Sequence, residues 1–250
     1  MRDNDFVSTA RGAPSFTIKE AQDIAARWYG LDADAAPLPS ERDQNFLLTE
    51  KKGRRFVLEI ANPREKRAVL ELQNKAFLHL KNHMSVGTCP ALISSSAGHN
   101  IETVLDKQNK EHYVRLVTYI PGKVLADAKP HSSELLFHLG AFLADLNAAL
   151  TDFSHPAAKR KLIWDLSQAL PLIEKFKRQI TQSGQRKLIE KFERRIRAAF
   201  HEKTEELTWG IIHNDGNDHN IIVSTPSLKS SSFGQMRITW LIDFGAMIYS

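Results

Sequence analysis

Apolar residues recur in four stretches of the chain at the three-to-four-residue spacing of an amphipathic helix. The first stretch follows a capping box formed by Thr17 and Glu20 and ends near Gly30. The second is predicted to begin at Asn62-Pro63, because Asn is a good N-cap and Pro is favoured at the first helical position. The third begins at Ser132 or Ser133, and the fourth covers residues 186–203. We expect each helix to pack its apolar face on a core.

Short runs rich in β-branched and aromatic residues predict strands between these helices. Residues 46–48 and 56–58 flank a Lys-Lys-Gly turn, and residues 113–120 stop at Pro121-Gly122. Further strands are expected at residues 211–212, at residues 221–223 and in the apolar run before Asp243. The segment with Pro37 and Pro39 is expected to be a linker, residues 84–97 a loop, and residues 224–234 an exposed hairpin. Helices and strands both occur along the chain, and the short strands joined by tight turns indicate an α+β fold.

The chain has 250 residues, 42% hydrophobic residues and 25% charged residues, as expected of a globular chain with one large domain or two small lobes. A net charge of +5 is mild, and the basic residues are not interleaved with aromatic ones. We therefore expect no nucleic-acid partner. No apolar run approaches the roughly 20 residues of a membrane span, so no membrane partner is expected. A single cysteine, Cys89, suits a reducing cytoplasm.

A polar loop between two apolar runs carries the candidate chemistry, in the sequence W-G-I-I-H-N-D-G-N-D-H-N-I-I-V. Asp215 and Asn220 stand five residues apart, and Asp243 follows at the end of a further strand. Phosphoryl transfer needs such a set: one carboxylate that receives the proton of a hydroxyl, and an Asn and a second carboxylate that hold Mg²⁺. A metal-hydrolase site made of His213, Asp215, Asp218 and His219 is an alternative, although its spacing differs from a helical H-E-x-x-H site.

The motif His213-x-Asp215-x4-Asn220, followed by Ile242-Asp243-Phe244-Gly245, resembles the catalytic core of the aminoglycoside phosphotransferase/choline kinase superfamily. Within it, H-N-D-G-N-D-H-N is most similar to the hydroxylysine-kinase-like group, which includes kinases fused to class III aminotransferases. The resemblance implies a protein-kinase-like fold of two lobes. A small lobe with an antiparallel sheet, residues 1–120, would bind the nucleotide, and a larger, mainly helical lobe, residues 121–250, would carry catalysis. We expect this second lobe to be truncated at the C-terminus.

The resemblance also implies a reaction, which is the Mg²⁺-dependent transfer of the γ-phosphoryl group of ATP or GTP to a hydroxyl. The acceptor would be a small amine or amino acid similar to hydroxylysine, and an aminotransferase could be a fused or separate partner. Asp215 would be the catalytic base, Asn220 and Asp243 would bind the metal, and His213 would orient the loop.

Nucleotide contacts are expected from the small lobe in three places, namely the turn at residues 40–45, the hinge at Tyr119 and Ile120, and the strand position of Glu59. The polar turn at residues 40–45 replaces a Gly-rich loop, and the nucleotide is expected to contact Ser40 and Phe46 there. Backbone groups near Tyr119 and Ile120 would meet the base.

Glu59 stands where the resemblance requires a lysine that contacts the phosphates, in V-L-E-I. A carboxylate there would repel phosphates by a few kcal/mol in a partly desolvated site, on the order given by Coulomb's law. Glu71 occupies the position of the helix carboxylate that would pair with that lysine. Three explanations stay open: another base substitutes (Arg55, Arg64 and Lys66 lie nearby), the residue is an error or a deliberate change, or the chain is a weak or inactive binding or regulatory module.

Overall fold

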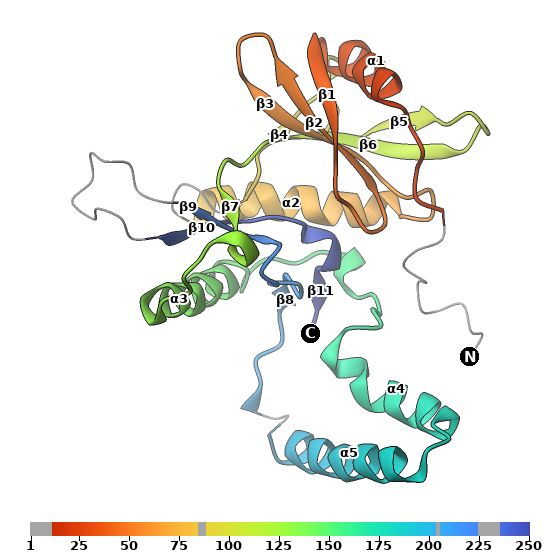
Figure 1. The fold of residues 1–250 in the computed structure, drawn as a ribbon, viewed down its shortest axis with the longest axis vertical. Helices are drawn as coiled ribbons and strands as arrows, with labels where there is room; N and C mark the ends of the chain where they lie inside the picture. Colours follow the sequence, from red (N-terminus) through yellow and green to blue (C-terminus); the bar gives the residue numbers. More distant parts are fainter. Residues whose placement is uncertain (1–11, 85–88, 204–205, 225–235) are drawn as a thin grey trace.

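The computed structural model describes residues 12–84, 89–203, 206–224 and 236–250. It has the mixed α+β architecture that the sequence predicts, with a sheet-rich N-terminal lobe and a mainly helical remainder (Figure 1). The α-helices are α1 (Ile18–Tyr29), α2 (Arg67–His83), α3 (Ser133–Ala149), α4 (Ala169–Phe176) and α5 (Ser183–Lys203). The described strands are β1 (Ala33–Leu38), β2 (Gln44–Glu50), β3 (Arg55–Ile60), β4 (Leu92–Ile93), β5 (Glu102–Leu105), β6 (Glu111–Thr118), β7 (Lys123–Val124), β8 (Ile211–Ile212), β9 (Ile221–Ser224), β10 (Arg237–Leu241) and β11 (Ile248–Tyr249). Short 3-10 turns are η1 (Leu125–Asp127), η2 (Pro156–Ala158), η3 (Leu166–Gln168), η4 (Lys177–Gln179) and η6 (Phe244–Ala246).

The N-terminal lobe is built on an antiparallel sheet with the order β1-β2-β3-β6-β4, in which β5 also pairs with β6. The hairpin of β2 and β3 turns at Gly53, as the sequence predicts, where a φ of 82° favours glycine. The expected linker around Pro37 is wrong, because Pro37 lies in β1 and pairs with Phe46. A proline is tolerated there because β1 is an edge strand, which needs fewer backbone donors.

Alternation along the strands gives the sheet two different faces. One face packs under α1 in a core that includes Ile24, Phe46, Leu48 and Leu58. Glu59 and its neighbour across the strands, Arg115, point to the opposite face, where α2 lies. The capping box at the start of α1 is confirmed.

Helix α2 joins the two lobes. Its residues Leu72, Ala76, Phe77 and Leu80 share one buried core with residues of α3, β8, β9, β10 and η6. The expected boundary between the lobes at residue 120 falls between β6 and β7. It stays a prediction, because α2 lies before this boundary and yet packs in a core with elements that lie after it. The predicted start of this helix is wrong: Asn62 accepts a bond from the Arg64 amide in a separate turn, and the N-cap is Lys66.

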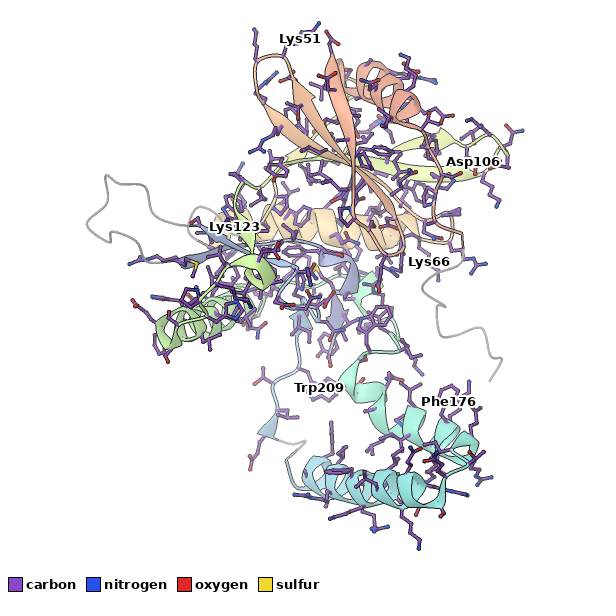
Figure 2. All side chains as sticks on the ribbon, in the orientation of Figure 1. Lys51, Lys66, Asp106, Lys123, Phe176 and Trp209 are labelled. Carbon is purple, nitrogen blue, oxygen red and sulfur yellow. The ribbon has the colours of Figure 1, made fainter. Side chains whose placement is uncertain are left out.

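The second half of the chain surrounds two small sheets, β10-β9-β7 and β11-β8. Ser132 caps α3 through the Leu135 amide, as expected. Helices α4 and α5 form a pair that extends away from the body, with Phe176 at the end of α4 and Trp209 on the segment that returns from α5 (Figure 2). The expected hairpin at residues 224–234 lies almost entirely outside the described residues. Within the described ranges, no helix is long and apolar enough to cross a bilayer.

Candidate active site

The polar loop between β8 and β9 holds Asp215 through the amides of two asparagines. Asn217 Nδ2 donates to Asp215 Oδ1 at 2.8 Å, and Asn220 Nδ2 donates to Asp215 Oδ2 at 3.0 Å. Asn220 Nδ2 also contacts the Asp215 carbonyl oxygen at 3.0 Å. The sequence spacing of five residues therefore brings the Asp215 carboxylate and the Asn220 amide into direct contact. Since both carboxylate oxygens accept hydrogen bonds, the side chain has a fixed orientation.

Asp243 lies at the end of β10 in a left-handed conformation, with φ 57° and ψ 73°. Such a conformation costs a non-glycine residue on the order of 1 kcal/mol or more and is concentrated at functional sites. Asp243 Oδ1 accepts a bond from the Gly245 amide at 3.1 Å. A Cβ on Gly245 would lie 2.9 Å from that oxygen, which explains the glycine. The backbone amide of Ile242 donates to the Asn220 carbonyl at 2.9 Å, so the two halves of the site are joined.

His213 connects the same two segments by its ring. Its Nδ1 accepts from the Asp215 amide at 3.2 Å, which places the ring proton on Nε2, and Nε2 donates to the Ile242 carbonyl at 3.2 Å. The ring is 3% exposed, and this burial lowers the pKa of His213 to about 4 despite the nearby carboxylates of Asp243 and Asp215. A neutral imidazole with both nitrogens engaged orients the loop, which supports the role expected from the sequence.

Phe244 links the candidate catalytic segments to α2. It is fully buried, and its ring meets the ring of Phe77 edge-on at 4.8 Å and that of His213 at 4.6 Å. Edge-to-face pairs of this kind contribute about 0.5–1.5 kcal/mol beyond their buried area. The position of α2 is therefore coupled to the residue next to Asp243.

The donor set of Asn220 and Asp243 fits Mg²⁺. The amide nitrogen of Asn220 is directed at Asp215, so its Oδ1 remains as an oxygen ligand. Asp243 is exposed and adds a carboxylate. Mg²⁺ takes oxygen ligands and is commonly held by one or two protein groups together with substrate phosphates. These two residues would hold the ion.

Glu59 has a partner that the sequence reading missed. Arg115 donates from Nε to Glu59 Oε2 at 2.5 Å, from Nη2 to Gln73 Oε1 at 2.6 Å and from Nη1 to Asn74 Oδ1 at 2.9 Å. The residue Arg115 is 4% exposed, so these contacts are largely shielded from water. The acid, Glu59, thus lies on β3, and its basic partner, Arg115, lies on the neighbouring strand β6. Only the strand register, which pairs Glu59 with Arg115, reveals this arrangement.

The expected role of Glu71 as the helix carboxylate facing this strand is wrong. Its side chain is about half exposed and pairs with Arg67 at 3.0 Å along α2. Gln73 and Asn74, two and three residues further along α2, point at Arg115 instead. Both are neutral amides, which accept bonds from arginine without adding charge.

The residues expected to contact a nucleotide differ in how far they are exposed to solvent. Ser40 is exposed in the turn between β1 and β2. Phe46 is 1% exposed, and its side chain lies in the core under α1. Its expected contact with a nucleotide stays a prediction. The Tyr119 backbone amide donates to the Arg55 carbonyl oxygen at 3.2 Å, and the Arg55 guanidinium carbon lies over the Tyr119 ring, 4.2 Å from its centre. Ile120, directly after it, is buried.

Arg42, which is not among the bases expected from the sequence, reaches the segment after Asp243 from the turn between β1 and β2. Its Nη2 lies 3.4 Å from the point where a Cβ on Gly245 would be. It also lies 3.8 Å from Glu65 Oε2, and its side chain is 18% exposed. The sequence S-E-R-D-Q-N-F displays the arginine, but only the folding of this turn over the other lobe shows where it points. Arg160 supports the same segment by donating to the Gly245 and Met247 carbonyls at 2.6 and 3.0 Å.

The turn that carries Arg42 also contains a perturbed acid. Burial raises the pKa of Asp43 to about 6, and the nearby Glu59 carboxylate adds to this, while the Asn62 amide and Arg42 oppose it.

The alternative metal-hydrolase set is not supported. In the part of the chain that the structure describes, three or more histidine, cysteine or acidic groups come close enough to share an ion only at His79, His83 and Asp152, elsewhere in the fold.

Comparisons with known proteins agree with this geometry. The model of the phosphotransferase enzyme family, abbreviated APH, matches residues 34–249. Hydroxylysine kinase of Mus musculus is 29% identical over 97% of this chain and 68% of its own length, and that of Danio rerio is 28% identical over 96% and 68%. The chain therefore spans about two thirds of the length of these relatives.

Solved structures show the same fold at lower identity. An amicoumacin kinase in complex with AMP-PNP, Ca²⁺ and amicoumacin has a TM-score of 0.65 at 17% identity, over 94% of this chain and 66% of that one. A microcompartment-associated aminopropanol kinase has a TM-score of 0.66 at 19% identity, over 93% and 70%. These similarities confirm the expected kinase-like α+β fold. The relatives give no support for the expected aminotransferase partner. With a family match over 216 of its residues, 34–249, this chain belongs to the phosphotransferase enzyme family.

Proposed function

We propose that this chain carries the catalytic site of a small-molecule kinase. The kinase transfers the γ-phosphoryl group of ATP or GTP to a hydroxyl on a small amine or amino acid of the hydroxylysine type. Family membership and the hydroxylysine kinase relatives support the reaction class and the acceptor class. The complex of a structural neighbour with AMP-PNP supports a nucleotide donor.

One observation carries the proposal. Asp215, Asn220 and Asp243 come from two separate segments, and the backbone bond between Ile242 and Asn220 joins those segments at 2.9 Å. His213 joins them a second time through its ring. The segments that carry a candidate proton acceptor and two candidate oxygen ligands are thus held together, which supports a site for phosphoryl transfer.

In this proposal Asp215 orients the acceptor hydroxyl and receives its proton late in transfer. The acceptor oxygen forms a bond to the γ-phosphorus while the bond from that phosphorus to the bridging oxygen breaks, and the nucleoside diphosphate leaves with that oxygen. The amides of Asn217 and Asn220 keep the carboxylate pointing in one direction. When bound at Asn220 and Asp243, Mg²⁺ neutralises phosphate charge.

Arg42 supplies the positive charge that Glu59 cannot. It is held near Gly245 by the turn over the site, on the side from which a Gly-rich loop covers phosphates in kinases. A guanidinium binds phosphate oxygens in pairs, so it is a suitable replacement for a lysine. Contact with a nucleotide would exchange its 3.8 Å contact with Glu65 for phosphate oxygens. Tyr119 and Ile120 would lie beside the base, and Ser40 at the rim of the turn.

The test is a phosphoryl-transfer assay on the full chain with MgATP and MgGTP against a panel of hydroxylated amines that includes 5-hydroxylysine and 1-amino-2-propanol. Asp215→Asn should lower kcat by about 10²–10⁴-fold, the usual size of a general-base contribution, and leave nucleotide affinity within about threefold. Asp218→Asn is the matched control, since Asp218 is an exposed acid three residues further along the same loop. Transfer at wild-type rates by Asp215→Asn would refute the assignment of the base.

The alternative, a weak or inactive binding module, rested on Glu59. The kinase relatives do not favour it, and the Arg115 contact explains Glu59 without requiring loss of activity. A thermal shift with MgATP or MgGTP, followed by the transfer assay, separates the two proposals. Stabilisation by nucleotide without any transfer across the panel would support the binding module, and absence of both would reject the kinase proposal for this chain.

A further inference from the structure

Two histidines near the C-terminal end of α2 lie one turn apart and face the same direction. The rings of His79 and His83 stack at 4.0 Å between centres with an angle of 16°. Histidines four residues apart on a helix present their nitrogens to one point, as in helical zinc sites. His83 Nδ1 contacts the His79 carbonyl oxygen at 2.8 Å, and a carbonyl can only accept. The proton therefore sits on Nδ1, and Nε2 carries the free electron pair that a metal needs.

A third ligand comes from the other lobe. Asp152 lies in the turn that follows α3, and its Oδ1 is 3.3 Å from His79 Nε2. Its Oδ2 is 3.9 Å from His83 Nε2. One ligand atom from each of the three side chains lies within 4.8 Å of the other two.

These separations are close to those of a tetrahedral metal site. With zinc bonds of about 2.0–2.1 Å, two ligands of one ion lie about 3.3–3.4 Å apart. His79 Nε2 and Asp152 Oδ1 already have this separation, and His83 Nε2 lies 3.9 Å from the other carboxylate oxygen, Oδ2. Because one ligand atom of each residue lies within 4.8 Å of the other two, the remaining pairs need to close by about 1.5 Å at most. The side chain of Asp152 is 72% exposed, so it can make this movement without disturbing the core.

We propose that His79, His83 and Asp152 form a binding site for a divalent transition-metal ion of the zinc class, which ties α2 to the end of α3. Two imidazoles and one carboxylate are the ligands of zinc, nickel and cobalt sites, whereas Mg²⁺ prefers oxygen ligands alone. Water would fill the fourth position. His79 Nε2 also contacts the Ala149 carbonyl at 2.8 Å, so binding requires the neutral tautomer with the proton on Nδ1 and the loss of that bond.

The ion would act on the position of α2. This helix carries Phe77, which packs on Phe244, and Gln73 and Asn74, which hold Arg115. An ion shared with Asp152 would fix the C-terminal end of the helix against the helical lobe. Occupancy of the site would therefore raise the thermal stability of the whole chain by mass action.

The test is calorimetric titration of tag-free, chelator-treated full-length chain with ZnCl₂ and NiCl₂, together with the visible absorption of the Co²⁺ form. One equivalent of Zn²⁺ should bind and raise Tm, and excess Mg²⁺ should not compete. His83→Ala should weaken Zn²⁺ binding at least tenfold. His138→Ala is the matched control, because His138 is a partly exposed helical histidine that faces Glu134 four residues earlier.

Binding must also be independent of the candidate catalytic metal ligands. The Asp243→Ala variant should bind Zn²⁺ as the wild type does, whether or not the chain has kinase activity. Absence of Zn²⁺ binding by the wild type would overturn the proposal. Wild-type affinity in His83→Ala, or loss of binding in Asp243→Ala, would place the ion elsewhere and overturn it as well.

Discussion

Glu59→Lys restores the residue expected from the kinase resemblance, but the structure predicts that it will destabilise the chain. The new ammonium would stand directly across the strands from Arg115, which is buried and already donates to Gln73 and Asn74. The substitution removes a short ion pair and replaces it with two like charges. No gain in nucleotide affinity is expected while Arg115 remains.

The magnitude follows from the burial of the two partners. Two unit charges 4 Å apart interact by about 4 kcal/mol at the effective dielectric of a protein surface. The Glu59 side chain is 23% exposed, so a lysine there can turn partly toward water, which reduces the penalty. We therefore expect a loss of about 2–4 kcal/mol in the free energy of unfolding, which combines the lost pair with residual repulsion. For a chain of this size that corresponds to a fall in Tm of roughly 10 °C.

Thermal and urea unfolding of the wild type, Glu59→Lys, Arg115→Glu and the double variant measure this coupling. The double variant restores opposite charges, so its stability should exceed the additive expectation by at least about 2 kcal/mol. Glu71→Lys is the matched control, since Glu71 is half exposed and its pair with Arg67 is worth at most about 0.5 kcal/mol.

A Glu59→Lys variant as stable as the wild type, or additive effects in the double variant, would show that Arg115 and Glu59 do not form the buried pair described above. The explanation of Glu59 would then fail. If Glu59→Lys also increased nucleotide affinity at unchanged stability, the position would be a phosphate-binding one after all.

Three further predictions test other parts of the site. Arg42→Gln should weaken ATP binding about tenfold or more in a titration while leaving adenosine binding unchanged, because adenosine lacks phosphates; equal losses for both ligands would contradict the phosphate role. Burial lowers the pKa of His213 to about 4, whereas the imidazole of the unfolded chain has a pKa of about 6.5. As the pH falls, the unfolded chain therefore binds a proton at this histidine before the folded chain does. The free energy of unfolding is thus highest above about pH 6.5 and decreases as the pH falls toward 4. His213→Gln should therefore reduce the loss of unfolding free energy between pH 7 and pH 5 by roughly 2 kcal/mol, measured by urea titration, and an identical pH dependence would refute the burial argument. Gly122→Ala should destabilise by about 2 kcal/mol or more, because φ is 146° and the added Cβ would meet Ile222 Cγ2 at 2.4 Å, whereas Gly140→Ala in open space within α3 should be neutral or stabilising in the same unfolding assay.

Local sequence patterns predicted elements whose signals lie within a few residues. The capping box at Thr17, the hairpin turn at Gly53 and the Ser132 cap all form as expected, because each depends on hydrogen bonds or dihedral preferences of adjacent residues. The same locality misled the reading of Asn62-Pro63, where a good helix-start signal forms an isolated turn because α2 begins later.

The sequence by itself determined the composition of the candidate site. A motif of fixed spacing along the chain identifies Asp215, Asn220 and Asp243, and recognising it requires no knowledge of the packing. The tertiary structure decided how the site is neutralised and supported. Strand register paired Glu59 with Arg115 across 56 residues, and a turn folded over the other lobe brought Arg42 beside Gly245. Neither contact has a local signal, because both depend on how distant segments pack, and a pattern along the chain does not encode which distant charge will face another.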